Sequence, residues 1–199
     1  DNEETGSDPE GGGKGQWVVD PVELGRIVER AHAEEFQVCT HAIGDEAIEE
    51  TLSAYEAVWG GDDGEGPRHR IEHFELASDD QIARLADAGV VASMQPNFLQ
   101  WAGEGGLYDQ RLGETRRKRT NRVRTVADAG ADLAFGSDCM PLDPLLGVHH
   151  AVNAPVEPQR LSVTEALRAY TLGGARAGFD EGRLGTLEPG KLADLVVLE

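Results

Sequence analysis

Residues 69–96, HRIEHFELASDDQIARLADAGVVASMQP, contain the unit from which much of this chain is built. HRIEH predicts a short strand. Ser78 is the N-cap of the helix that follows, Gly89 ends that helix, and VVASMQP predicts a second, continuously apolar strand. A strand, a helix and another strand in succession predict a βα unit whose strands run parallel.

The same pattern extends in both directions along the chain. Asp20 followed by Pro21 begins an amphipathic helix that ends near Phe36, and QVCTH at 37–41 predicts a strand. A further helix begins at Asp45. Toward the other end, the predicted elements are a basic-faced helix over 116–130, a strand over 131–138 and a capped helix over 162–179. Four strands that alternate with helices predict an α/β fold with a parallel sheet buried on both faces.

The two ends of the chain have a different character. Residues 1–16 are rich in Gly, Asp and Glu and have no apolar periodicity, which predicts a flexible acidic arm. Residues 181–199 predict two short strands joined by Pro189-Gly190, the pair that a type II turn requires. The expected organisation is therefore an arm over 1–16, an α/β unit over 17–180 and a small β segment over 181–199.

The charge of the chain restricts its partners. Its 199 residues include 18 Lys and Arg against 37 Asp and Glu, a net charge of −19. Such a surface repels phosphate backbones and anionic lipid headgroups, so we expect no nucleic-acid partner and no membrane partner. The one basic patch, at 116–124, is interpreted as a salt-bridged helix. Acidic residues in nearly every segment predict a halophilic protein, and an ordinary acidic cytosolic protein is the alternative.

Nothing in the sequence predicts export. It shows no signal peptide and no apolar stretch near the roughly 18 residues that span a bilayer. Cys39 and Cys139 are too few for a disulfide framework and predict reduced thiols. We therefore expect a cytoplasmic protein.

Three polar residues end predicted strands. His41 ends the first strand, His73 the second and Asp138 the fourth. His41 and His73 are 32 residues apart, which is one βα unit, and His73 and Asp138 are 65 apart, which is two. The carboxyl ends of parallel strands meet at one rim, where ligands and catalytic residues gather. We therefore expect the three side chains to converge.

Two imidazoles and a carboxylate are ligands that suit a borderline divalent metal. Zinc is the expected ion, with a fourth position open for water whose pKa the metal lowers toward about 7. Asp138 is the candidate base for the proton of that water. A structural role remains the alternative for each residue alone, because a strand-end His is often only hydrogen-bonded and an Asp after Gly-Ser can cap a turn.

Five motifs, in this order and at appropriate distances, resemble the amidohydrolase superfamily, in particular its amidohydrolase 3 branch. They are THAIGD at 40–45, RIEH at 70–73, SMQP at 93–96, FGSD at 135–138 and LGTLEPGKLADLVVL at 184–198. The resemblance implies a distorted (β/α)8 TIM barrel with a small β-sandwich, of which this chain holds barrel units five to eight and part of the sandwich. It also implies that His41 and His73 are metal ligands of the fifth and sixth strands, and that Asp138 is the metal-binding, proton-shuttling aspartate of the eighth.

The departures from the family pattern concern the other half of the site. The first-strand H-x-H pair is absent, and so is the fourth-strand bridging residue, since Lys14 lies in a Gly-rich segment. We therefore expect a carboxyl-terminal part of a larger enzyme that binds one or two ions. This part is expected to be inactive alone.

The sequence thus predicts a metal-dependent hydrolase that cleaves an amide or cyclic amide C–N bond of a small molecule with metal-activated water. Asn97 and Trp101, in a long loop after the third strand, are candidate substrate contacts. A non-catalytic regulatory or interaction protein on the same scaffold is the alternative function. The open edges and uncovered apolar interior of a half-barrel predict a homodimer whose stability depends on ionic strength.

Overall fold

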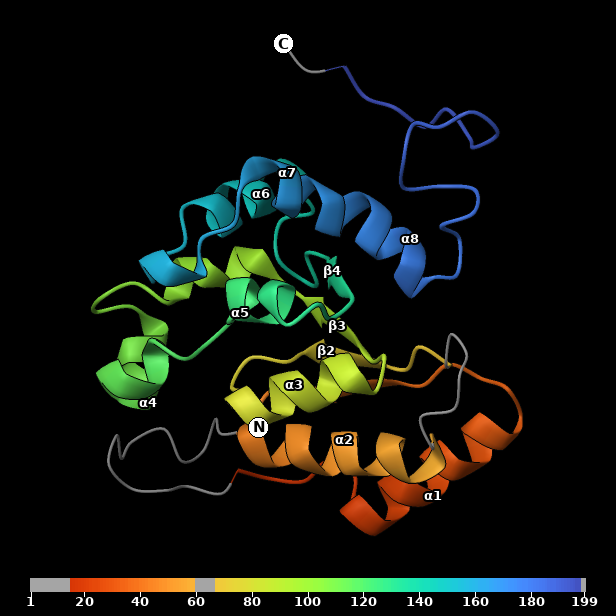
Figure 1. Cartoon of the computed structure of the whole chain (residues 1–199). Helices are drawn as coiled ribbons and strands as arrows, with labels where there is room; N and C mark the ends of the chain where they lie inside the picture. Colours follow the sequence, from red (N-terminus) through yellow and green to blue (C-terminus); the bar gives the residue numbers. More distant parts are fainter. Residues whose placement is uncertain (1–14, 60–66, 198–199) are drawn as a thin grey trace.

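The computed structural model describes residues 15–59 and 67–197. Four parallel strands form one sheet in the order β1-β2-β3-β4, which confirms the predicted α/β class (Figure 1). Their bounds are β1 Cys39–Ala42, β2 Arg70–His73, β3 Val91–Met94 and β4 Leu133–Phe135. The order in space is the order in sequence, so each strand returns to the sheet beside its predecessor.

Helices connect and follow these strands (Figure 1). Their bounds are α1 Pro21–Ala33, α2 Asp45–Val58, α3 Asp79–Asp87, α4 Leu107–Arg117, α5 Val123–Asp128, α6 Pro144–Val152, α7 Val163–Arg168 and α8 Gly174–Ala177. Three short elements lie among them: the 3-10 helices η1 Pro96–Trp101 and η2 Glu157–Gln159, and the π-helical turn η3 Ala169–Gly173 between α7 and α8.

Side chains set the starts of three helices where the sequence predicted them. The Asp20 carboxylate accepts a hydrogen bond from the Val22 N–H, and Pro21 follows at the first helical position. Ser78 and Ser162 each form a capping box, with Gln81 and Glu165 as the reciprocal partners. These caps fix where the three helices begin.

The core lies between the sheet and its helices. Ile71, Ala92 and Met94 are fully buried and belong to one cluster with helix side chains such as Leu52 and Leu85. Because side chains alternate along a strand, one face of each strand contributes to this cluster and the other does not.

The face of the sheet that this core does not cover is polar over β1 and β2. Cys39 and His41 are exposed on β1, and at the paired positions of β2 the Arg70 Nε and Glu72 Oε1 form an ion pair of 2.9 Å. The expectations of an uncovered apolar interior and of burial on both faces are therefore wrong for β1 and β2. On β3 and β4 the same face is apolar and buried, where Val91 and Ala134 cluster with Ala177 of α8. The outer edges of β1 and β4, which have no strand partner among the described residues, still favour association.

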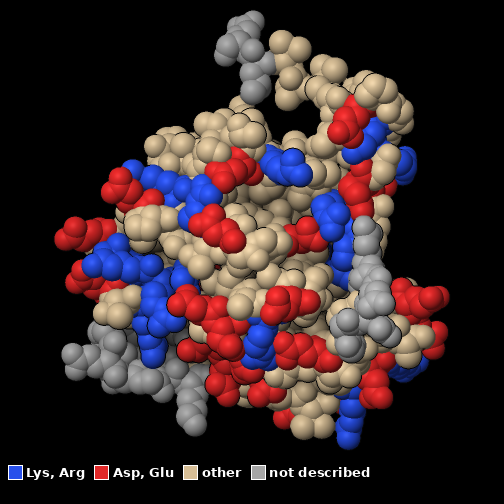
Figure 2. Space-filling model, in the orientation of Figure 1, with Lys and Arg blue, Asp and Glu red and all other residues tan. Residues whose placement is uncertain are grey.

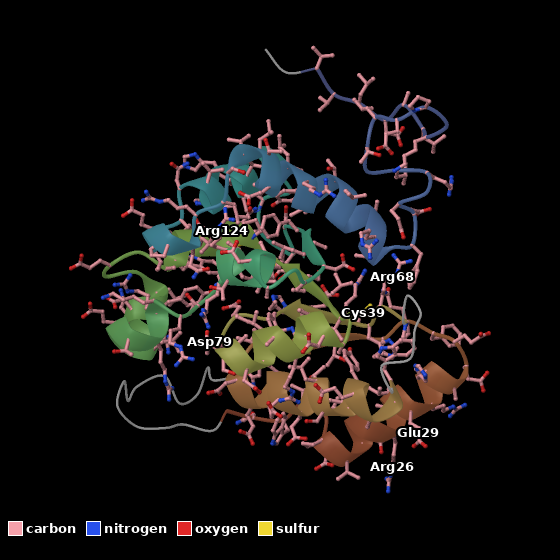
Figure 3. The ribbon with its side chains drawn as sticks, viewed as in Figure 1. Arg26, Glu29, Cys39, Arg68, Asp79 and Arg124 are labelled. Carbon is pink, nitrogen blue, oxygen red and sulfur yellow. The ribbon has the colours of Figure 1, made fainter. Side chains whose placement is uncertain are left out.

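The basic helix predicted over 116–130 is two helices, α4 and α5. The chain turns between them at Asn121, which has a left-handed backbone with φ of 49°. The predicted ion pairs are confirmed: Arg117 contacts Asp109 at 2.9 Å, and Arg124 contacts Glu165 at 2.7 Å. Figure 3 labels Arg124 on α5, and Figure 2 shows basic side chains interspersed with acidic ones over this face of the molecule.

The carboxyl-terminal segment forms the predicted turn without the predicted strands. The Lys191 N–H donates to the Glu188 carbonyl across Pro189-Gly190, and Gly190 has φ of 97°, as a type II turn requires. No strand occurs in the described residues after Phe135. A two-stranded ribbon is marginal by itself, and this segment has no third strand to pack on within the described ranges. The predicted arm over 1–16 lies almost wholly outside those ranges.

Two further expectations concern the whole described chain. No helix among residues 15–59 and 67–197 is long and apolar enough to cross a membrane. Cys39 and Cys139 are both free thiols and both exposed.

Arg68 fastens the amino-terminal end of β2. Its guanidinium pairs with Glu181 at 2.8 Å, donates to the Arg176 carbonyl at 2.8 Å and stacks over the Phe179 ring at 4.1 Å. Figure 3 shows Arg68 where the end of α8 approaches the sheet. This buried group ties α8 to the end of the sheet opposite the candidate site.

A buried imidazole, that of His69, lies at the same end of the sheet. His69 accepts a hydrogen bond at Nδ1 from the Val38 N–H, and its ring lies 5.6 Å from that of His32 and 4.8 Å from that of Tyr55. Burial, with a smaller contribution from His32, lowers the pKa of His69 from 6.5 to about 4. The folded chain therefore holds this imidazole neutral near pH 7.

This pKa shift predicts a loss of stability in mild acid. Between pH 6.5 and 4 the unfolded chain binds a proton at His69 that the folded chain does not. The free energy of unfolding should fall over that window by on the order of 2 kcal/mol through this residue. Urea unfolding of the parent chain and of His69→Asn, which keeps an acceptor for Val38, measures the difference. An equally steep pH dependence in the variant would contradict the assignment.

Candidate functional site

The pairing of β1 with β2 brings the two strand-end histidines together. His41 lies opposite Glu72 in the register, and His73 is the next residue. The two imidazole rings are 4.4 Å apart between centroids, with 72° between their planes. His41 is exposed and His73 is 8% exposed, so the pair has one buried member and one open to the rim.

The backbone at this rim is strained. His73, Phe74 and Asp138 have φ angles of 76°, 50° and 49°, in the left-handed region that residues other than glycine rarely adopt. Residues are held in such conformations where the surrounding structure fixes them, and such residues cluster at functional sites. Both the end of β2 and the loop after β4 carry this feature.

The electrostatic environment keeps His73 neutral. Burial lowers the pKa of His73, nearby His41 lowers it further, and the Asp138 carboxylate opposes both. The Nδ1 atom of His73 is buried and has no hydrogen-bond partner in the described residues. A neutral imidazole with an unused nitrogen is the form that binds a metal ion.

The donor set fits a divalent ion in part. Two adjacent imidazoles supply two nitrogen ligands, which suit zinc and related ions. Asp138 is exposed on the loop after β4, where its carboxylate lies 3.8 Å from the Cys139 thiol. No group of three His, Cys, Asp or Glu side chains within residues 15–59 and 67–197 is arranged to hold an ion. Asp138 is thus near His73 without completing a ligand set.

Sequence reasoning missed a buried carboxyl group two residues after His73. Glu75 is 4% exposed, and its Oε2 accepts a hydrogen bond of 2.7 Å from the Tyr108 hydroxyl. Its backbone carbonyl accepts from the Asn121 N–H at 2.9 Å. Burial raises the pKa of Glu75 and that of Tyr108. The one signal in the sequence was an acidic residue just after the end of a predicted strand. It was not enough to predict the contact, because the partner Tyr108 lies 33 residues away.

Aromatic rings connect His73 to Tyr108. Phe98 stacks on His73 with centroids 6.0 Å apart, Trp101 follows Phe98 at 4.9 Å, and Tyr108 follows Trp101 at 6.2 Å. Trp101 is partly exposed. Asn97, from the same turn of η1, is fully buried, and its Nδ2 donates to the Pro141 carbonyl at 3.2 Å. The two expected substrate contacts thus occupy different environments.

Parallel βα units with polar side chains at the carboxyl ends of their strands have the arrangement of part of a (β/α)8 barrel. The model of the amidohydrolase family matches residues 5–199, so this chain belongs to the amidohydrolase family. The predicted resemblance is confirmed.

Relatives and a solved structure agree with this assignment. Protein LONG AFTER FAR-RED 3 of Arabidopsis thaliana is 34% identical, covering 92% of this chain and 33% of that protein. N-substituted formamide deformylase of Arthrobacter pascens is 31% identical, covering 89% and 34%. The crystal structure of an uncharacterized metal-dependent hydrolase from Pyrococcus furiosus superimposes with a TM-score of 0.80 at 34% identity, covering 94% of this chain and 38% of the other. The chain spans about a third of the length of these curated relatives, and its fold is part of a TIM barrel.

The Glu75–Tyr108 contact gives a stability prediction. Tyr108→Phe removes the only side-chain hydrogen bond of good geometry to the buried Glu75 carboxyl in the described residues and should lower the free energy of unfolding by about 1–3 kcal/mol. Urea unfolding of Tyr108→Phe in the parent and in a Glu75→Leu background measures the coupling. Equal losses in both backgrounds would show that the phenol stabilises through its ring alone.

Proposed function

We propose that this protein hydrolyses the C–N bond of a small-molecule amide or cyclic amide, with a divalent metal and with Asp138 as its proton-transferring residue. The observation that carries the proposal is the His41–His73 pair, 4.4 Å apart at the carboxyl ends of adjacent strands, with the Asp138 carboxylate acting on His73 from the same rim. Membership of the amidohydrolase family supports the hydrolase class.

His41 and His73 would hold the ion. Zinc is proposed because nitrogen ligands suit it, with one or two ions present. When bound, a divalent ion supplies a water activated for attack on a carbonyl group. The lowered pKa of His73 keeps its nitrogen free of a competing proton near neutral pH.

Asp138 is proposed both as a ligand and as the group that takes and returns a proton. Its carboxylate is exposed at the rim, so substrate and water can reach it. The strained backbone at Asp138 is consistent with a side chain held in place for a task.

The substrate class is proposed from the wall beside His73. Trp101 offers an accessible aromatic surface next to Phe98, which suits a flat or apolar substituent on the amide nitrogen. A relative's name, N-substituted formamide deformylase, describes an amide of this kind. Asn97 was the other expected substrate contact, but it is fully buried, so it lies behind the Phe98 and Trp101 rings and cannot touch a substrate there.

Further features stay predictions. The 199-residue chain alone is expected to be inactive, because its described residues bring only two metal ligands together. Residues 181–199 are proposed as part of a β-sandwich. A cytoplasmic location, a halophilic surface and a salt-dependent dimer through the open edges of β1 and β4 are proposed on the charge and the sheet topology.

Asp138→Asn should abolish turnover in the full-length protein while leaving its fold intact, because the amide cannot take up the proton. Hydrolysis of N-substituted formamides, followed by mass spectrometry of the released amine, measures it, and circular dichroism checks the fold. Asp87→Asn, an exposed aspartate at the end of α3, is the control for the same change of charge. Turnover that survives in Asp138→Asn would refute this role and favour the non-catalytic alternative.

The purified 199-residue chain should bind zinc weakly, well below one ion per chain by elemental analysis after dialysis. Replacing His41 and His73 together with Ala should reduce the remaining binding to background. The control is the same double replacement at His149 and His150, an adjacent pair on α6 whose rings are 5.5 Å apart. Tight stoichiometric zinc, or equal losses in both double variants, would contradict the ligand assignment.

A further inference from the structure

A buried polar cluster lies directly behind the loop that carries Asp138. It consists of Asn97 on η1, Tyr170 on η3 and Gly147 on α6. Asn97 is 0% exposed, and its Oδ1 has no hydrogen-bond partner in the described residues. The Tyr170 hydroxyl is likewise buried without a partner, and burial raises the pKa of that phenol to about 12.

Gly147 shows that the two unpartnered atoms converge. A methyl group added at Gly147 would lie 1.8 Å from the Tyr170 hydroxyl oxygen and 2.7 Å from Asn97 Oδ1. Both oxygens therefore lie beside the same point of α6, with no hydrogen bond between them in the structure, and only glycine leaves room for both. A hydroxyl donates and an amide oxygen accepts, so the atoms are complementary. Leaving each buried and unpaired would cost about 1–3 kcal/mol.

The same two side chains border the Asp138 loop. The Nδ2 atom of Asn97 donates to the Pro141 carbonyl at 3.2 Å, three residues after Asp138. The Tyr170 ring packs edge-on against Phe135, the last residue of β4, with centroids 5.5 Å apart. The nearby Ser137 hydroxyl partly opposes the rise in the pKa of Tyr170. The cluster thus touches the chain on both sides of Asp138.

The loop itself is short and bonded at its start. The Gly136 N–H donates to the Met94 carbonyl at 3.0 Å, and the Met140 N–H donates to the Ser137 carbonyl at 3.1 Å, which closes a turn around Asp138. After this turn, Asn97 is the side chain that binds the loop at Pro141. Tyr170 lies in a π-helical turn, a distortion that often occurs at functional sites.

We propose that Asn97 and Tyr170 are positioning residues that bond to each other across Gly147 and set the position of Asp138. This bond requires the two side chains to rotate from their positions in the structure, so that the Tyr170 hydroxyl donates to Asn97 Oδ1; it would then orient the Asn97 amide whose Nδ2 holds the Pro141 carbonyl. Asn97 thereby acts behind the site instead of on the substrate. This role rests on the proposed function of Asp138.

The test uses Tyr170→Phe, which removes one oxygen, Asn97→Leu, which keeps the shape of the side chain, and the double variant. Hydrogen exchange measured by mass spectrometry should accelerate about tenfold in residues 136–143 in each single variant. It should stay unchanged in 70–73. The double variant should be no faster than Asn97→Leu, because both changes break one connection. Additive effects, or no change confined to 136–143, would overturn the proposal.

Kinetics of the full-length protein separate positioning from general stability. With an N-substituted formamide, each single variant should lose about tenfold in kcat with KM unchanged, since partners behind a site typically affect activity by 10- to 100-fold. A loss in KM alone would assign Asn97 to the substrate and overturn the proposal. If the parent hydrolyses none of these amides, the proposed function fails, whereas the exchange data still decide whether the cluster fixes the loop.

Discussion

Hydrogen bonds between parallel strands place the residues on which the candidate site depends. In the β1–β2 register, His41 pairs with Glu72 and Ala42 with His73, so the two imidazoles end one step apart on neighbouring strands. Successive side chains of a regular strand point to opposite faces, so this step in register would by itself separate the rings. The left-handed backbone of His73, with φ of 76°, ends the regular alternation there, and the two rings lie 4.4 Å apart.

The two ends of the sheet are built differently because they have different tasks. At the amino-terminal end, Arg68 makes every kind of contact open to a guanidinium: an ion pair, a carbonyl hydrogen bond and a ring contact. At the carboxyl end, the His41 and His73 rings lie 4.4 Å apart. Buried polar atoms without a hydrogen-bond partner in the described residues occur at both ends, on His73 and Asn97 at one and on His69 and Glu181 at the other, so the ring contact and not these atoms distinguishes the candidate site.

Sequence patterns predicted elements better than contacts. The number and order of the strands, the Asp20 cap and the capping box at Ser162 depend on neighbouring residues and were predicted correctly. The strands predicted over 90–96 and 131–138 end earlier, at Met94 and Phe135, so Asp138 lies in the loop after β4 and not at its end. The helix over 116–130 was predicted wrongly, because its break at Asn121 follows from a hydrogen bond to Glu75, 46 residues earlier. The inner face was predicted apolar throughout on the expectation of a half-barrel, but it is polar over β1 and β2, because strands this short leave it ambiguous which side chains point inward.

The sequence by itself determined the α/β class, the family and the three residues proposed to act on metal and proton, because caps, periodicity and motif order are local properties of the chain. Only the tertiary structure decided which side chains meet. Glu75 joins Tyr108, Arg68 joins Glu181, and Asn97 faces Tyr170 across Gly147. These contacts join residues that are far apart in the sequence. They form because burial of apolar surface packs the helices and strands together, which no local pattern of residues specifies.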